Sequence, residues 1–137
     1  MIRDSIYNLL KKVSKESTPT KRIEKLREVD TPVLRGVLKH AFDPGVKFLL
    51  PEGAPPYKEN DFPSQEHLLY NNYRRMYLFV EGGRDDLKPI KREMLFIQFL
   101  ETIDKDDAKL MIAVKDKKIP FKGITANMVK KAFPDLY

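Results

Sequence analysis

The chain has 137 residues, with 26 lysines and arginines against 20 aspartates and glutamates, and no cysteine. This length fits one domain with a hydrophobic core of ordinary size. The lack of cysteine excludes disulfides, thiolate chemistry and cysteine-based zinc sites. No apolar run approaches the roughly 20 residues of a membrane span, and the N-terminus lacks the apolar stretch of a signal peptide. We therefore expect a soluble cytoplasmic protein.

The net charge of +6 is concentrated near one end of the chain. Residues 115–131 carry six lysines and one aspartate, whereas residues 32–114 carry twelve basic and thirteen acidic residues. A focused positive field raises the local concentration of a polyanion more than scattered charge does. Nucleic acid is therefore the leading candidate partner, with an acidic protein or an anionic membrane surface behind it. A merely solvated lysine face is the structural alternative.

Two helices are predicted before residue 30. Thr20 is of a type that caps helix N-termini, so it is expected to open the second helix, with Ile23 and Leu26 on the apolar face. The first helix is indicated by apolar residues at helical spacing, which are Ile2, Ile6, Leu9, Leu10 and Val13.

A third helix and a long loop follow. Pro32 suits the first turn of a helix, and the apolar spacing continues to Phe42, before Pro44 and Gly45 stop it. Residues 43–63 hold five prolines and two glycines, too many helix and strand breakers for a regular element. We expect an ordered but irregular surface loop over this range.

Two helices are predicted in the next part of the chain. Ser64 is expected to open one that runs to Val80 and stops at the following pair of glycines. Pro89 is expected to start the other. Its stretch 94–103 is apolar almost all round, which predicts a helix packed in the centre of the domain.

Two more helices are predicted at the C-terminal end. The acidic run 104–107 suits the N-terminus of a helix that continues to Val114, because early acids interact favourably with the helix dipole. Thr125 is a good N-cap for a last helix over residues 126–133. The sequence shows no internal repeat and no convincing strand pair. It predicts an all-α protein of about seven helices in a single domain over residues 1–137.

Motifs of catalysis are missing from the sequence. Neither a GxxxxGK[ST] nor a GxGxxG phosphate loop is present. The acidic run at Asp104 does not continue as a calcium loop, because Lys109 and Lys115 stand where glycine and glutamate are needed. His40 and His67 are too far apart in sequence to indicate a metal site, and no serine lies in a histidine-and-acid pattern. We expect no enzyme, no cofactor, no bound metal and no small-molecule substrate.

The basic segment contains a candidate phosphate-binding turn. Gly123 precedes the helix cap Thr125, so free backbone N–H groups are expected at the positive end of the helix dipole. The glycine is expected to let a sugar-phosphate strand approach closely, and the threonine hydroxyl to cap the helix or donate to phosphate. The lysines expected to add phosphate contacts are Lys118, Lys122, Lys130 and Lys131.

Two other basic pairs are candidate phosphate contacts. Lys21 and Arg22 lie on the predicted second helix. Arg74 and Arg75 lie among tyrosines at helical spacing. This spacing favours a half-buried stripe over rings exposed for base stacking.

Three segments resemble the N-terminal DNA-binding domain of ATP-dependent DNA ligases, especially those of T-even-type phages. They are IYNLLKKVSKESTPTKRIEKLRE, TPVLRGVLKHAFDPGVKFLL and the final stretch in which Ile124 and Thr125 precede NMVKKAFPDL. Together they cover most of the chain in order. The resemblance implies sequence-independent contact with duplex backbone and minor groove, with Gly123, Thr125 and the flanking lysines at phosphate. The Lys-x-Asp-Gly lysine that ligases adenylate is absent.

The sequence thus predicts a free-standing, ligase-like, non-catalytic domain that binds duplex or nicked DNA in support of replication or repair, in the host cytoplasm if a bacteriophage encodes it. A replication or repair protein is a possible further partner, and no membrane is expected. About five neutralised phosphates would give a log–log salt slope near −4 to −5. The alternative is an interaction module or inhibitor that binds an acidic host or phage protein through the basic C-terminal face, since fold analogy does not establish function.

Overall fold

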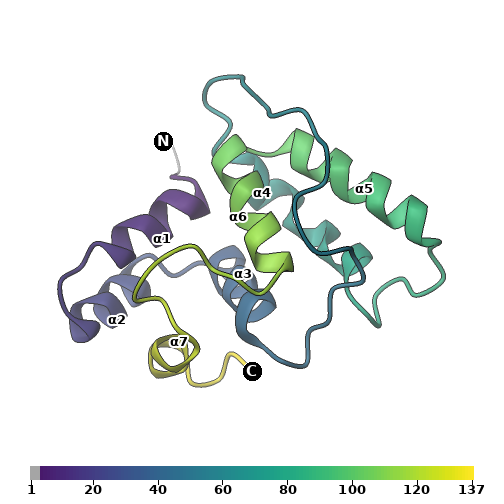
Figure 1. The fold of residues 1–137 in the computed structure, drawn as a ribbon. Coiled ribbons are helices and arrows are strands. Elements are labelled where there is room, and N and C mark those ends of the chain that lie inside the picture. Colours follow the sequence, from purple (N-terminus) through teal and green to yellow (C-terminus); the bar gives the residue numbers. More distant parts are fainter. Residues whose placement is uncertain (1–3) are drawn as a thin grey trace.

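Helix α6 (Lys105–Lys115) lies at the centre of the computed structural model, which describes residues 4–137. It packs against α1 (Ile6–Ser14), α3 (Pro32–Phe42) and α5 (Pro89–Thr102). These helices surround it from different sides, as Figure 1 shows. The arrangement makes α6 the element that packs against the largest number of other helices.

The remaining helices form two groups at opposite ends of the molecule. Helix α2 (Pro19–Glu28) packs against α1 and against α7 (Ala126–Ala132). Helix α4 (Leu68–Asn72) continues into a 3₁₀ helix, η1 (Tyr73–Phe79), which packs against α5. Figure 1 shows α2 and α7 at one end and α5 at the other.

The predicted all-α class is confirmed by the seven α-helices of the described residues. No strand forms within residues 4–137, where a single antiparallel bridge joins Phe48 to Val80. The predicted irregular loop over residues 43–63 is also confirmed, apart from that bridge. None of the helices within residues 4–137 combines the length and apolarity needed to cross a membrane.

Side-chain caps and first-turn prolines set the helix starts. The predicted cap at Thr125 is found, and Thr31 caps α3 in the same way, each accepting a hydrogen bond from the backbone N–H three residues later. The second helix is capped by Thr18 rather than by Thr20. The prediction of Thr20 is wrong because Pro19 occupies the first helical position, where its missing N–H costs nothing. Ile2, predicted on the first helix, lies outside the described residues.

Residues 64–80 do not form the single helix that was predicted. Ser64 has a φ of +60°, and α4 begins four residues later without a side-chain cap. After one turn the chain tightens into η1. Its large apolar residues Tyr73, Met76 and Phe79 recur every three residues, which is the period of a 3₁₀ helix and not of an α-helix.

Helix α5 lies at the edge of the domain and not in its centre. Its inner face buries Phe96, Phe99 and Leu100, whereas Ile90 and Met94 are 74% and 51% exposed. The prediction of a central helix over residues 94–103 is therefore wrong for its outer face. Ile90 and Met94 on that face are left largely exposed by the other described residues.

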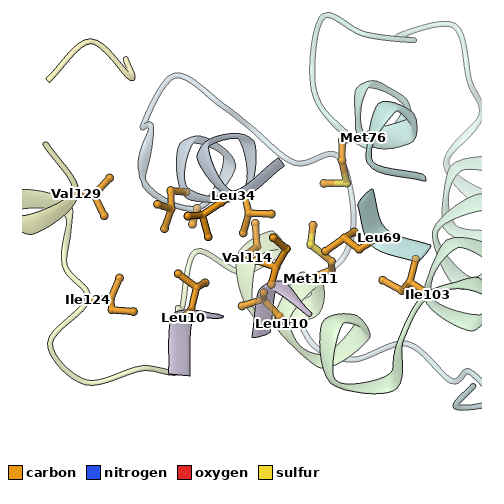
Figure 2. Packing of buried hydrophobic residues seen from close by; sticks show 14 of the residues in the cluster. Leu10, Leu34, Leu69, Met76, Ile103, Leu110, Met111, Val114, Ile124 and Val129 are labelled. Atoms are coloured by element: carbon orange, nitrogen blue, oxygen red, sulfur yellow. The ribbon is translucent and has the colours of Figure 1, made fainter. Parts of the chain in front are cut away.

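One hydrophobic core joins the helices across the molecule. Figure 2 shows side chains of α1, α3 and α6 pointing toward one another, with residues before and within α7 reaching the core from one side and residues of η1 and the α5–α6 turn from the other. The core therefore connects the α2–α7 end to the α5 end. Residues that illustrate it are Leu10, Leu34, Leu110, Val114, Ile124, Val129, Met76 and Ile103.

Asp107, in the first turn of α6, fastens that helix to the start of α1. Its side chain is fully buried, and its Oδ1 accepts a hydrogen bond of 2.9 Å from the backbone N–H of Tyr7. This N–H belongs to the first turn of α1, where helix donors lack intrahelical partners. The other oxygen has no partner among the described atoms. Burial raises the pKa of this carboxyl to about 7, against the opposing effect of the Tyr7 hydrogen bond.

Asp107→Asn should become more stable relative to the parent protein as pH rises. The folded pKa of about 7 lies above the ordinary value of 3.8, so the folded protein keeps a proton that the unfolded chain releases. The contribution of Asp107 to stability is therefore full below about pH 4 and is lost as pH rises to about 7. An amide does not titrate. The unfolding free energy of the variant minus that of the parent should thus increase by on the order of 2 kcal/mol between about pH 5 and about pH 8.

Urea denaturation followed by circular dichroism at the two pH values measures this difference. The matched control is Asp106→Asn, the same change one residue earlier, where the side chain is half-exposed. A difference that stays constant with pH for Asp107→Asn, or that rises equally for Asp106→Asn, would contradict the raised pKa of Asp107.

Candidate nucleic-acid interface

Lys115, the first lysine of the basic segment, is not a surface charge. It is 5% exposed, and its ammonium donates to the carbonyl of Pro51 at 2.7 Å and to the carboxylate of Asp116. The second oxygen of Asp116 accepts a hydrogen bond of 3.1 Å from the N–H of Gly53. This ion pair therefore holds the proline-rich loop against the C-terminus of α6.

Lys117 is also engaged in the fold. It follows α6 in the left-handed region at a φ of 59°, where glycine is the usual residue. Its ammonium donates to the carbonyls of His40 at 2.6 Å and Asp43 at 3.1 Å, at the C-terminal end of α3. Carbonyls there lack intrahelical partners and carry the negative end of the helix dipole. Lys117 therefore joins the C-terminus of α6 to that of α3.

Lys118, predicted to flank the phosphate turn, faces the proline-rich loop instead. Its ammonium lies 3.1 Å from a carboxylate oxygen of Glu52, and both side chains are largely exposed. An exposed pair of this kind contributes little to stability, but each charge is compensated locally. The uncompensated charge of the basic segment is left to Lys122, Lys130 and Lys131.

A shallow groove between α2 and α7 brings together four of the predicted site residues. It has a volume of about 250 Å³, and its walls come from segments at opposite ends of the chain. We call it the α2–α7 groove. It is lined by Arg22, Gly123, Thr125 and Lys131, together with Pro19, Ile23, Asn127 and Met128.

Helix α7 is held in place by a side chain of α2 at one end and by a side chain of α1 near the other. At its C-terminal end, Arg27 of α2 donates to the carbonyls of Ala132 at 3.1 Å and Lys131 at 2.8 Å. Just before its N-terminal end, the hydroxyl of Ser14 donates to the carbonyl of Lys122 at 2.7 Å. The position of α7 relative to α2, and hence the groove, is fixed by these side chains.

Arg22 covers the glycine that was predicted to face phosphate. A Cβ added to Gly123 would lie 2.8 Å from the Nε of Arg22, and this Nε donates to the carbonyl of Glu16 at 3.1 Å. In the structure the arginine side chain occupies the space in which the prediction puts a sugar-phosphate strand beside Gly123. The half-buried guanidinium is the polar group that the groove presents there.

Thr125 caps the last helix as predicted. Its hydroxyl oxygen accepts a hydrogen bond of 3.2 Å from the N–H of Met128, and the side chain is exposed. A hydroxyl that accepts in this way keeps its own proton for donation. Thr125 therefore adds a hydrogen-bond donor to the rim of the groove.

Lys21 lies outside the α2–α7 groove. It lines a separate hollow of about 280 Å³ with Lys25 and three carboxylates, those of Glu16, Glu24 and Glu28. Acids outnumber lysines in this hollow, so the local field does not favour a polyanion. Lys21 does not join the predicted phosphate site.

Arg74 and Arg75 are also placed away from the groove. Both are exposed on η1, which packs against α4 and α5, and Figure 1 shows α4 well separated from α7. The tyrosine stripe beside them is partly buried. The hydroxyl of Tyr73 contacts the ring nitrogen of His40, and burial raises the pKa of Tyr73 well above its usual range.

Asn127 is a groove residue that was not predicted from the sequence. It is exposed and lies four residues before Lys131 on α7, so the two side chains share a helix face. This spacing was a signal that could have identified it. A carboxamide next to a lysine offers both donor and acceptor groups to a ligand.

These features define an all-α protein with a basic groove built from the two ends of its chain. The chain belongs to DUF6433, a family of unknown function, which matches residues 9–120. The matched range includes α2 to α6 and most of α1, and it stops before α7. No curated protein and no solved structure matches the chain.

Gly123→Ala should destabilise the protein more than Gly53→Ala. The two glycines have φ values of +88° and +92°, so alanine is strained to a similar degree at both. Only at Gly123 does a new Cβ meet another side chain, because nothing lies within 4 Å at Gly53. We expect a loss of about 1 kcal/mol in unfolding free energy for Gly53→Ala and on the order of 1 kcal/mol more for Gly123→Ala, because the arginine side chain must move and lose its hydrogen bond to Glu16.

Urea denaturation measures both losses, and Arg22→Ala provides the second test. In an Arg22→Ala background the extra cost of Gly123→Ala should disappear, since the obstructing side chain is gone. Equal losses for the two glycines, or an extra cost that persists without Arg22, would mean that the arginine does not cover Gly123.

Proposed function

We propose that this protein binds duplex DNA, without sequence preference, through the cations of the α2–α7 groove. The observation that carries the proposal is the convergence of Arg22 and Lys131 from opposite ends of the chain on one groove. Lys122 and Lys130 are exposed beside it, and the sequence has no carboxylate between residues 117 and 134. Such an arrangement concentrates positive charge where several phosphates of a polyanion could be contacted together.

The shape of the groove favours an extended ligand over an enclosed one. Its volume of about 250 Å³ is below the range typical of small-molecule pockets, which is about 300–1,000 Å³. The ammonium of Lys130 lies 5.1 Å from the ring centroid of Tyr137, a contact that leaves its N–H groups free to donate. Contacts of this kind position a phosphate backbone but do not read bases.

The likeness of three segments to the DNA-binding domain of ATP-dependent ligases supports DNA as the polyanion. It also makes a nicked duplex the most informative probe. The sequence lacks the Lys-x-Asp-Gly lysine of ligases, so the proposal is limited to binding, in support of a replication or repair reaction that another protein carries out. The ligase-like character is itself part of this proposal.

The structure leaves fewer lysines free to contact phosphate than the number of lysines in the basic segment suggests. Lys115, Lys117 and Lys118 each have a partner within the protein. Arg22 and Lys131 in the groove, and the exposed Lys122 and Lys130 of the basic segment, are left as candidate phosphate contacts. About four neutralised phosphates would give a log–log salt slope near −3.6 for duplex DNA.

Replacing Lys122, Lys130 and Lys131 together by glutamine should weaken binding to every DNA sequence alike. Each lysine removed should reduce the magnitude of the salt slope by about 1, so the slope of the triple variant should fall to about −1. Fluorescence anisotropy with intact and nicked duplexes of two unrelated sequences, over a series of salt concentrations, measures both affinity and slope. Glutamine keeps the helix propensity of α7 close to that of the parent.

The matched control is a second triple variant, Lys47→Gln, Lys58→Gln and Lys105→Gln, which removes the same charge from exposed lysines outside the groove. Its affinity should stay within about threefold of the parent and its slope nearly unchanged. Equal losses in the two triple variants would show that only net charge matters and would rule out the groove. A parent protein that binds no DNA even at low salt would overturn the proposal and favour an acidic protein as the partner of the basic face.

A further inference from the structure

One face of α1 lies over the segment that leads into α7. The ring centroids of Tyr7 and Phe121 are 5.1 Å apart. The hydroxyl of Ser14 donates to the carbonyl of Lys122 at 2.7 Å. Lys11 stands four residues after Tyr7 and three before Ser14, so the three side chains share this face of the helix. The exposed side chain of Lys11 therefore lies beside the segment 121–122.

Two lysines near the C-terminal end of α1 carry charge that the protein does not compensate. Lys11 and Lys15 are exposed and four residues apart, so they lie in one row along the helix. Neither ammonium group has a hydrogen-bond or ion-pair partner within residues 4–137. Lys12, one residue after Lys11, differs because its ammonium forms an ion pair with Asp4. The C-terminal half of α1 therefore presents two cations to solvent beside Lys122.

The acids closest in sequence do not neutralise these cations. Glu16 directly follows Lys15, but its side chain is half-buried and lines the separate hollow with Lys21 and Lys25. The segment that α1 covers has no carboxylate of its own, because residues 117–134 contain neither aspartate nor glutamate. The local field around this part of α1 therefore attracts a polyanion.

Lys122 connects the lysines of α1 to the α2–α7 groove. Its carbonyl is held by Ser14 of α1, and its own side chain is exposed. The next residue, Gly123, lies under the side chain of Arg22 and lines the groove. Figure 1 shows the segment between α6 and α7 passing the C-terminal half of α1 before it reaches α7. The cations therefore form one row from α1 across Lys122 to the groove.

We propose that a duplex bound at the α2–α7 groove continues across Lys122 onto α1, where Lys11 and Lys15 contact further phosphates of the same DNA. This inference rests on the proposed function and enlarges its site. A row of cations from several segments suits a long phosphate backbone better than a single phosphate group. Phe121, the aromatic side chain beside this row, is half-buried against Tyr7, which favours backbone contact over base stacking.

The salt dependence of binding distinguishes the enlarged site from the smaller one. Four phosphate contacts give log–log slopes near −3.6 for the parent and near −1 for the glutamine triple variant of Lys122, Lys130 and Lys131. Six contacts give slopes of about −5.4 and about −2.7 for the same two proteins. We expect the steeper pair of slopes from fluorescence anisotropy with a duplex over a series of salt concentrations. The shallower pair would overturn the extension onto α1.

Lys11→Gln combined with Lys15→Gln should weaken duplex binding by about tenfold or more at about 0.1 M salt and reduce the magnitude of the slope by about 2. Glutamine keeps the helix propensity of α1 close to that of the parent, and circular dichroism verifies the fold. The matched control is Lys88→Gln with Lys91→Gln, which removes the same charge from two exposed lysines at the start of α5. Its affinity should stay within about threefold of the parent. Equal losses in the two double variants would overturn the role of Lys11 and Lys15.

Photo-cross-linking shows directly which surface the DNA touches. The chain has no cysteine, so Lys15→Cys carries a single thiol to which an azidophenacyl group can be attached. Irradiation should join it to a bound duplex, as it should for Asn127→Cys in the groove, whereas Lys47→Cys, an exposed position outside the site, should not react. Cross-links from Asn127→Cys without any from Lys15→Cys would overturn the extension and leave the proposed function intact. A parent that binds no duplex would overturn both.

Discussion

The fold depends on charged side chains that fasten both ends of helix α6. At its start, the buried carboxylate of Asp107 accepts the Tyr7 N–H and so orients α1. At its end, the ammonium groups of Lys115 and Lys117 donate to carbonyls of the proline-rich loop and of α3. Buried polar groups are costly unless they are paired, so the contacts of Asp107 and Lys115 permit few alternative arrangements of the segments that they join. Apolar packing supplies most of the stability, and these hydrogen bonds select one arrangement of the helices.

The helices that could be predicted from the sequence are those whose first residues are typical of helix N-termini. A first-turn proline or a threonine cap marks α3, α5 and α7, and an acidic first turn marks α6. The segment 64–80 could not be predicted in the same way, since its apolar residues fit a period of three as well as one of 3.6. The placement of α5 was missed for another reason. A helix that is apolar on all sides is buried on all sides only if other parts of the protein pack against each of them.

The candidate site was predicted in part, and the errors have a common cause. Counting lysines identifies a basic segment, but it does not distinguish an ammonium that caps a helix from one that faces solvent. Lys117 belongs to the first kind, Lys115 is buried in an ion pair that binds the proline-rich loop, and Lys122 and Lys131 belong to the second kind. The pairing of Arg22 with Gly123 was out of reach for a related reason, since it requires knowing that α2 packs on α7. What the sequence did indicate is that both segments carry candidate phosphate contacts.

The way in which α7 is held has a consequence for the order of events during synthesis. Arg27 and its acceptor on Ala132 are separated by 105 residues, so one wall of the groove is synthesised well before the other. Contacts between such distant residues form late, because a long loop must be closed before they are gained. A nascent chain therefore carries Arg22 and Arg27 without the groove. Any product that stops before residue 123 lacks the surface altogether, however well its first six helices fold.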